Sequence, residues 1–144
     1  MDKNVTYIGI VVVVVIIIAA YAVLMGAPPA GPDMSQTGIY RSFSSQAVAP
    51  GQSVTVTLDV VVAGGEDYYL IEEFVPEGWT AMVGENTMDN RITYYVLQNA
   101  ESKAYTYTAV APDTPGTYEF SGKYMFQGDE EELATMGPTS VTVA

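Results

Sequence analysis

The clearest structural signal in this chain is SVTVTLDVVV, the stretch from Ser53 to Val62. Apolar and polar side chains alternate strictly at its start, which is typical of a β-strand with one buried face and one solvated face. Successive side chains on a strand point to opposite faces. The apolar face therefore holds Val54, Val56, Leu58, Val60 and Val62, and the polar face holds Thr55, Thr57 and Asp59.

Similar period-two segments follow on both sides of this stretch. Turn signals separate them roughly every 8–12 residues, and PDTPG (residues 112–116) is a strong one. We expect a polar loop at residues 84–90 and a bulge at Gly122. The pattern predicts an all-β domain, an antiparallel immunoglobulin-like β-sandwich of about seven or eight strands. Besides 53–62, the expected strands are 39–46, 68–75, 79–83, 92–97, 104–111, 117–126 and 140–143.

Tyrosine is the dominant aromatic residue, with 11 copies. Adjacent tyrosines on a strand point to opposite faces, so one member of each pair is expected in the core and its neighbour outside. Tyrosines two residues apart are expected to share a face. The adjacent pairs are Tyr68–Tyr69 and Tyr94–Tyr95, and the spaced pair is Tyr105 and Tyr107.

An uncharged apolar run, YIGIVVVVVIIIAAYAVLM, extends from Tyr7 to Met25. As a helix it would span about 28 Å, close to the thickness of a bilayer's hydrocarbon core. Lys3 precedes the run, and no Lys or Arg follows it until Arg41, which predicts a cytoplasmic N-terminus. A cleaved secretory signal is the competing interpretation, and both interpretations export the same domain.

The sequence thus predicts a single-pass protein of the cell membrane with an extracellular C-terminal domain. The predicted organisation is a short cytoplasmic N-terminus (1–6), a transmembrane helix (7–27), a Pro/Gly linker (28–37) and an extracellular immunoglobulin-like β-sandwich (38–144).

Composition narrows the range of functions. The chain has no Cys and no His, which removes the usual ligands of zinc, iron and copper and the usual general base. Its formal net charge is −12, and the part from Asp33 onward has 16 acidic residues against four basic ones. Such a field argues against binding nucleic acid. We expect neither a cofactor nor an enzymatic activity, since a Ser-Lys dyad using Lys103 or Lys123 has no motif support.

The only run of charges is the acidic turn formed by Asp129, Glu130, Glu131 and Glu132. Adjacent carboxylates are weak candidates for a Ca²⁺ site, because calcium takes six to eight oxygen ligands. The spacing of an EF-hand loop is absent, so a solvated hairpin turn is the preferred interpretation.

Two further features stand inside the predicted strands. Glu72 and Glu73 are adjacent, so one of them must face inward or lie at a sheet edge. An inward acid is a candidate for a shifted pKa. The preferred interpretation is an acid that faces solvent at an edge strand or pairs with Arg91 or Lys123. Trp79, the lone tryptophan, is expected in the core or capping it.

Four segments resemble a known type of module. They are AVAPGQSVTVTLDV, IEEFVPEGWT, AVAPDTPGTYEFSGKYMF and TSVTV, which together run through residues 47–143. The chain resembles the immunoglobulin-like modules of exported archaeal and some bacterial cell-surface proteins. The resemblance implies an appended or repeated surface unit and an archaeal origin, and it supplies no catalytic residue.

The leading hypothesis is an exported domain that acts by protein–protein contact, as an accessory subunit of a membrane complex or a cell-surface interaction module. Its expected partners are other membrane or cell-surface proteins, which include a second copy of itself, and the lipid bilayer through Tyr7–Met25. Exposed tyrosines would supply contact surface. The alternative is a filament subunit similar to archaeal pilins and archaellins, whose helices form the filament core. The nearest candidate for the processing site of such a protein is Lys3-Asn4-Val5.

Overall fold

The computed structural model describes residues 35–144, which form β-strands, turns and connections. In this part of the chain no helix has the length and apolar character needed to cross a bilayer. The predicted membrane helix, including Tyr7–Met25, lies outside the described residues.

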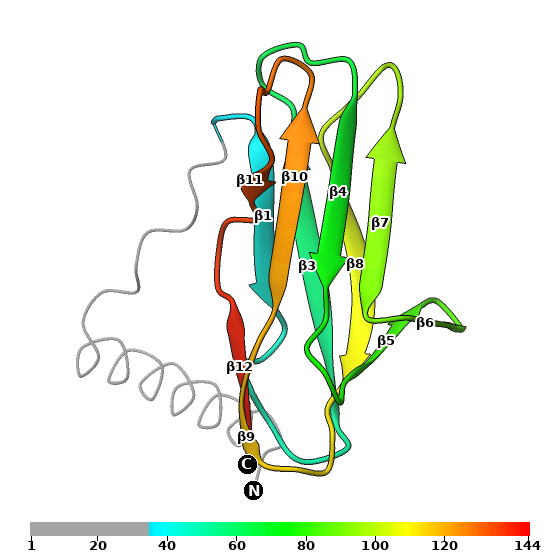
Figure 1. The fold of residues 1–144 in the computed structure, drawn as a ribbon, viewed down its shortest axis with the longest axis vertical. Helices are drawn as coiled ribbons and strands as arrows, with labels where there is room; N and C mark the ends of the chain where they lie inside the picture. Colours follow the sequence, from blue (N-terminus) through cyan, green and yellow to red (C-terminus); the bar gives the residue numbers. More distant parts are fainter. Residues whose placement is uncertain (1–34) are drawn as a thin grey trace, which may run out of the picture. The chain divides into compact units, whose positions relative to one another are not determined.

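The strands form three sheets (Figure 1). Neighbouring strands are antiparallel throughout, except that β2 and β12 are parallel. The five-stranded sheet has the order β1 (Gly38–Phe43), β3 (Ser53–Val61), β8 (Lys103–Val110), β5 (Thr80–Val83), β6 (Asn86–Met88). The four-stranded sheet has the order β11 (Leu133–Ala134), β10 (Ser121–Phe126), β4 (Tyr69–Phe74), β7 (Arg91–Val96). The three-stranded sheet has the order β2 (Ala47–Val48), β12 (Ser140–Val143), β9 (Gly116–Glu119).

The five-stranded and four-stranded sheets pack on each other through their apolar faces. One buried cluster joins Ile39 and Leu58 of the first sheet to Tyr69, Ile71 and Phe126 of the second. The alternation in residues 53–62 directs Leu58 into this cluster and turns the apolar residues at alternate positions of β3 to the same inner face. Val54, Val56, Leu58 and Val60 are buried as predicted, whereas Val62 lies one residue past the end of β3 and is half-buried.

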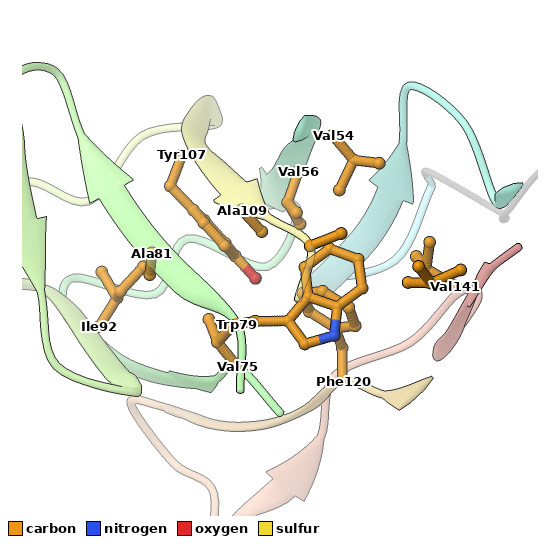
Figure 2. Close-up of a cluster of buried hydrophobic side chains, with 12 residues drawn as sticks. Val54, Val56, Val75, Trp79, Ala81, Ile92, Tyr107, Ala109, Phe120 and Val141 are labelled. Carbon is orange, nitrogen blue, oxygen red and sulfur yellow. The ribbon is translucent and has the colours of Figure 1, made fainter. Parts of the chain in front are cut away.

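A second buried cluster surrounds Trp79 and draws side chains from all three sheets (Figure 2). Trp79 is 4% exposed, and its ring packs edge-on against Phe120, with 5.1 Å between the ring centroids. Phe120 in turn contacts Phe43 edge-on at 5.0 Å. The predicted core position of Trp79 is confirmed.

The tyrosine predictions are confirmed as well. Tyr69 is buried while Tyr68 is exposed, and Tyr94 is half-buried while Tyr95 is exposed. The side chains of Tyr105 and Tyr107 share the inner face of β8. The Tyr105 hydroxyl lies 2.7 Å from the Tyr69 hydroxyl, and the Tyr107 hydroxyl donates to Glu73 at 3.1 Å.

Three predictions about strands and loops are wrong. Residues 117–126 were expected to form one strand, but the chain changes partner at Phe120, so β9 pairs with β12 and β10 pairs with β4. No bulge occurs at Gly122, since its register opposite Glu73 is regular. The expected loop at residues 84–90 contains the short edge strand β6, whose residues are all exposed.

Candidate interaction surface

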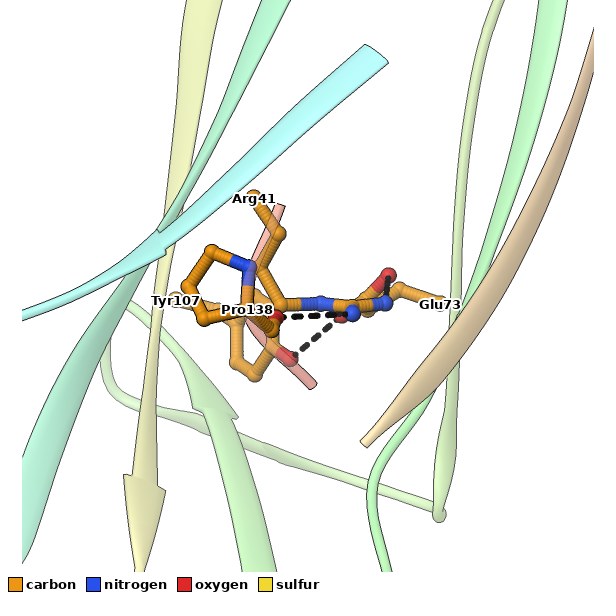
Figure 3. A network of polar contacts seen from close by, with 4 residues as sticks. All are labelled: Arg41, Glu73, Tyr107 and Pro138. Carbon is orange, nitrogen blue, oxygen red and sulfur yellow. Dashed lines mark hydrogen bonds and ion pairs between the residues drawn. The ribbon is translucent and has the colours of Figure 1, made fainter. Parts of the chain in front are cut away.

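A buried ion pair joins the two facing sheets (Figure 3). Arg41 comes from β1 and Glu73 from β4, and both side chains are fully buried. The guanidinium donates twice to the carboxylate, from Nε to Oε1 at 2.5 Å and from Nη2 to Oε2 at 2.9 Å. Arg41 also donates to the carbonyl of Pro138 at 3.3 Å, and Tyr107 completes the coordination of Glu73.

Burial and the neighbouring charges act on the pKa values of Glu73 and Tyr107 in this network. Burial raises the pKa of the Glu73 carboxyl, while the adjacent guanidinium of Arg41 and the Tyr107 hydroxyl lower it in part. Burial also raises the pKa of Tyr107, and the neighbouring Glu73 carboxylate raises it further. Because the pair is closed to solvent, its geometry fits a structural tie between the sheets and offers no surface to a ligand.

The ion pair of Glu73 with Arg41 differs from the sequence-based prediction, which placed the acid at a sheet edge or paired it with Arg91 or Lys123. β4 lies between β10 and β7, so neither acid is at a sheet edge. Glu72 does point outward and pairs with Lys123 at 3.2 Å and with Arg91 at 3.5 Å. Glu73 points inward and takes Arg41, a partner that the sequence analysis missed. The signal was present, because Ile39 and Ile71 are inward and each ion-pair residue follows one of them by two positions.

The acidic turn has ordinary hairpin geometry. The backbone amide of Phe126 donates to the Asp129 carboxylate at 2.8 Å, and Lys123 pairs with Glu132 at 2.8 Å. Glu130 and Glu131 are exposed. Nowhere in residues 35–144 do three or more acidic, His or Cys side chains gather in a group that would hold a metal ion.

The strongest candidate for a functional surface is the outer face of the four-stranded sheet. The register pairs Leu70 of β4 with Tyr95 of β7 on one side and with Met125 of β10 on the other. The same register, continued by one residue, places Leu97 opposite Tyr68. We call these five residues the outer-face patch.

Four of the five side chains of this patch are exposed, and Met125 is half-buried. The exposed fraction is 76% for Leu97, 63% for Tyr95, 44% for Tyr68 and 41% for Leu70. Single exposed apolar residues are common on protein surfaces, but a contiguous group marks a binding surface. Tyrosine in particular is enriched where proteins meet.

The patch is also uncharged on a strongly acidic chain. The next row along the same face is polar and consists of Lys123, Glu72 and Thr93, which lie opposite one another in the register. The face is therefore divided into an apolar half and a half that holds an ion-pair network. The polar row borders the patch on one side, as polar residues border the apolar part of an interface.

Comparisons with known proteins add little to this picture. The chain matches no protein-family model and no curated protein sequence. Among solved structures it is similar to the human F-spondin reeler domain (fragment 2), with a TM-score of 0.42 and 9% sequence identity. That similarity covers 78% of this chain and 98% of the reeler chain.

Proposed function

We propose that this chain is a single-pass membrane protein whose exported, immunoglobulin-like β-sandwich acts by protein–protein contact. It would serve as an accessory subunit of a membrane complex or as a cell-surface interaction module. The observation that carries the proposal is the outer-face patch, an exposed and uncharged group of aromatic and aliphatic side chains on a chain of net charge −12. The uncharged run Tyr7–Met25 supports the anchor.

The arrangement of the sheets supports the sandwich part of the proposal. Two mainly antiparallel sheets bury their inner faces against each other, and the chain crosses between them repeatedly. The two buried charged side chains of the described residues, Arg41 and Glu73, pair with each other, and Tyr107 donates to Glu73. A contact function needs only the outside of such a domain.

The test is purification of the full chain from its own membranes in mild detergent, with mass spectrometry of the proteins that remain bound. We expect stoichiometric partners with the unaltered chain. Tyr95→Ser and Leu97→Ser should each lose those partners. Leu133→Ser is the matched control, because Leu133 is 45% exposed but stands opposite the buried Tyr124 in the register, so it belongs to the other face of the sheet from the patch. Equal loss in all three variants, or no partner at all, would contradict the proposal.

The same preparation separates the filament alternative. An intact Met1 together with stoichiometric partners of other sequence supports an accessory or surface-contact role. A homopolymer whose chains lack their first residues would instead establish the filament subunit and overturn the leading proposal.

A further inference from the structure

The edge of the four-stranded sheet at β7 has unpaired backbone groups. Among the described strands β7 pairs with β4 alone, and it forms the right-hand edge of this sheet in Figure 1. The amide of Val75 donates to the carbonyl of Asn90 at 2.8 Å, which sets the phase of the ladder. Since antiparallel hydrogen bonds alternate, Ile92 and every second residue after it bond to β4. The N–H and C=O groups of Arg91, Thr93 and Tyr95 therefore point away from the sheet.

No other sheet edge in residues 35–144 offers a comparable template. The edge strands β2 and β11 have two residues each, β6 has three and β9 has four. β1 has six residues, but Met136 covers its outer side through hydrogen bonds with Arg41 and Ile39 at 2.7 and 2.9 Å. β7 has six residues, and no described residue on its outer side forms a backbone hydrogen bond with it.

β7 has few of the features that usually protect an edge. Proteins block exposed edges with proline, charged residues (lysine above all), bulges or very short strands. The one charged residue of β7, Arg91, is at its first position and pairs with Glu72. The sequence RITYYV contains neither proline nor lysine, and its register with β4 is regular over the whole strand. Its residues are mostly β-branched or aromatic, which favours pairing with another strand.

We propose that β7 binds an extended segment of a partner protein, which adds to the four-stranded sheet as a further strand. This inference rests on the proposed contact function and specifies its mode. An added strand would satisfy the outward groups of Arg91, Thr93 and Tyr95 by main-chain hydrogen bonds. Its side chains on the outer face would lie beside Tyr95 and Leu97, and so extend the outer-face patch.

Charge identifies the kind of segment. β7 has no acidic residue, and its one charged side chain, Arg91, already pairs with Glu72. An exposed acid lies in the connection on each side of it, Asp89 before the strand and Glu101 after it. A segment with an apolar centre and basic ends complements this edge. A second copy of the acidic chain would bring like charges together, which opposes self-pairing.

The experiment uses the full chain in mild detergent and synthetic peptides as probes. The test peptide has an alternating Val/Thr/Tyr centre with lysines at both ends, and the matched peptide has glutamates in place of the lysines. We expect the lysine peptide to bind about tenfold more tightly, because several exposed charge pairs change sign. Amide hydrogen exchange should show new protection at Thr93 and Tyr95. A lysine peptide with N-methylated alternate amides should not bind.

A backbone variant separates strand addition from side-chain contact. Thr93→Pro removes an outward N–H without touching the ladder to β4, and proline is tolerated at strand edges. We expect it to lose the lysine peptide while Thr93→Ala retains it, with Trp79 fluorescence reporting that both are folded. The N-methylated peptide gives the same test on the unaltered chain if Thr93→Pro fails to fold.

Three outcomes would overturn the inference. They are equal binding of the two charged peptides, protection that maps to another strand, and a β7-mediated dimer without peptide. If the natural partners are lost with Leu97→Ser but retained with folded Thr93→Pro, the proposed contact function stands and strand addition is wrong.

Discussion

Arg41 and Glu73 show how much one pair of residues can tie together. Glu73→Gln would leave the Arg41 guanidinium buried without its counter-charge, so we expect a loss of about 3–5 kcal/mol in the free energy of unfolding. Glu72→Gln is the matched control one residue away. Its ion pairs are with exposed partners, so its loss should stay below about 1 kcal/mol. Denaturant unfolding of the full chain, followed through Trp79 fluorescence, measures both. Equal losses would show that the buried pair contributes no more than the surface pairs.

Gly122 lies so close to the Arg41–Glu73 pair that there is no room for a larger side chain. A Cβ at this position would collide with the Glu73 carboxylate and would stand 2.6 Å from the Thr135 hydroxyl and 2.9 Å from the Arg41 guanidinium. We expect Gly122→Ala to cost about 1–3 kcal/mol of stability, as overpacking of a core does. Ser121→Ala, at an exposed neighbouring position of β10, should change stability by less than about 0.5 kcal/mol. The same denaturation measurement compares them, and an unchanged Gly122→Ala would mean that the pair can shift without cost.

The junction between β9 and β10 depends on the packing of one side chain, Phe120. Phe120 lies where the chain leaves one sheet for another, and its ring contacts both Trp79 and Phe43. Phe120→Ala should therefore cost about 3–5 kcal/mol and shift the Trp79 emission to longer wavelength as water enters. Tyr95→Ala removes an aromatic ring of similar size from the surface and should leave the emission unchanged. A native emission spectrum for Phe120→Ala would show that the cluster closes without this ring.

Period-two alternation was enough to predict most of the long strands, because burial of one face sets the sequence pattern directly. It placed the apolar face of β3 and separated Tyr68 from Tyr69 correctly. It could not divide residues 117–126, because the side chains keep alternating while the hydrogen-bond partner changes from β12 to β4. It also could not find β6, whose three residues are all exposed and hence have no apolar face.

The candidate surface was only partly predictable for a similar reason. Alternation predicted that one tyrosine of each pair faces outward. It did not predict that Leu70, Tyr95 and Met125 form one row, because a row across three strands depends on their register. The partner of Glu73 was missed because β1 and β4 are far apart in sequence and belong to different sheets.

At the level of the whole chain, the high net charge opposes the protein–protein contact that we propose. A net charge of −12 keeps molecules apart and favours solubility, but it also destabilises the folded state by repulsion among carboxylates. Specific contact then needs a place where this repulsion is weak. The outer-face patch and the adjoining edge of β7 together form such a place, with Arg91 paired and no acid within the strand.

Repulsion on this scale predicts a strong response to salt. Raising NaCl from low concentration to about 1 M shortens the Debye length to about 3 Å, so the temperature of unfolding of the full chain should rise. The double variant Glu130→Gln/Glu131→Gln removes two exposed charges and leaves the packing of the described residues unchanged. It should raise the unfolding temperature at low salt and reduce the further gain from added salt. Thermal unfolding followed through Trp79 fluorescence, with sucrose at equal osmolality as the control for non-ionic effects, tests both expectations. A temperature of unfolding that falls with salt would mean that ion pairs such as Arg91–Glu72 outweigh the repulsion, and the chain's acidity would then have to be explained by its partners rather than by its own solubility.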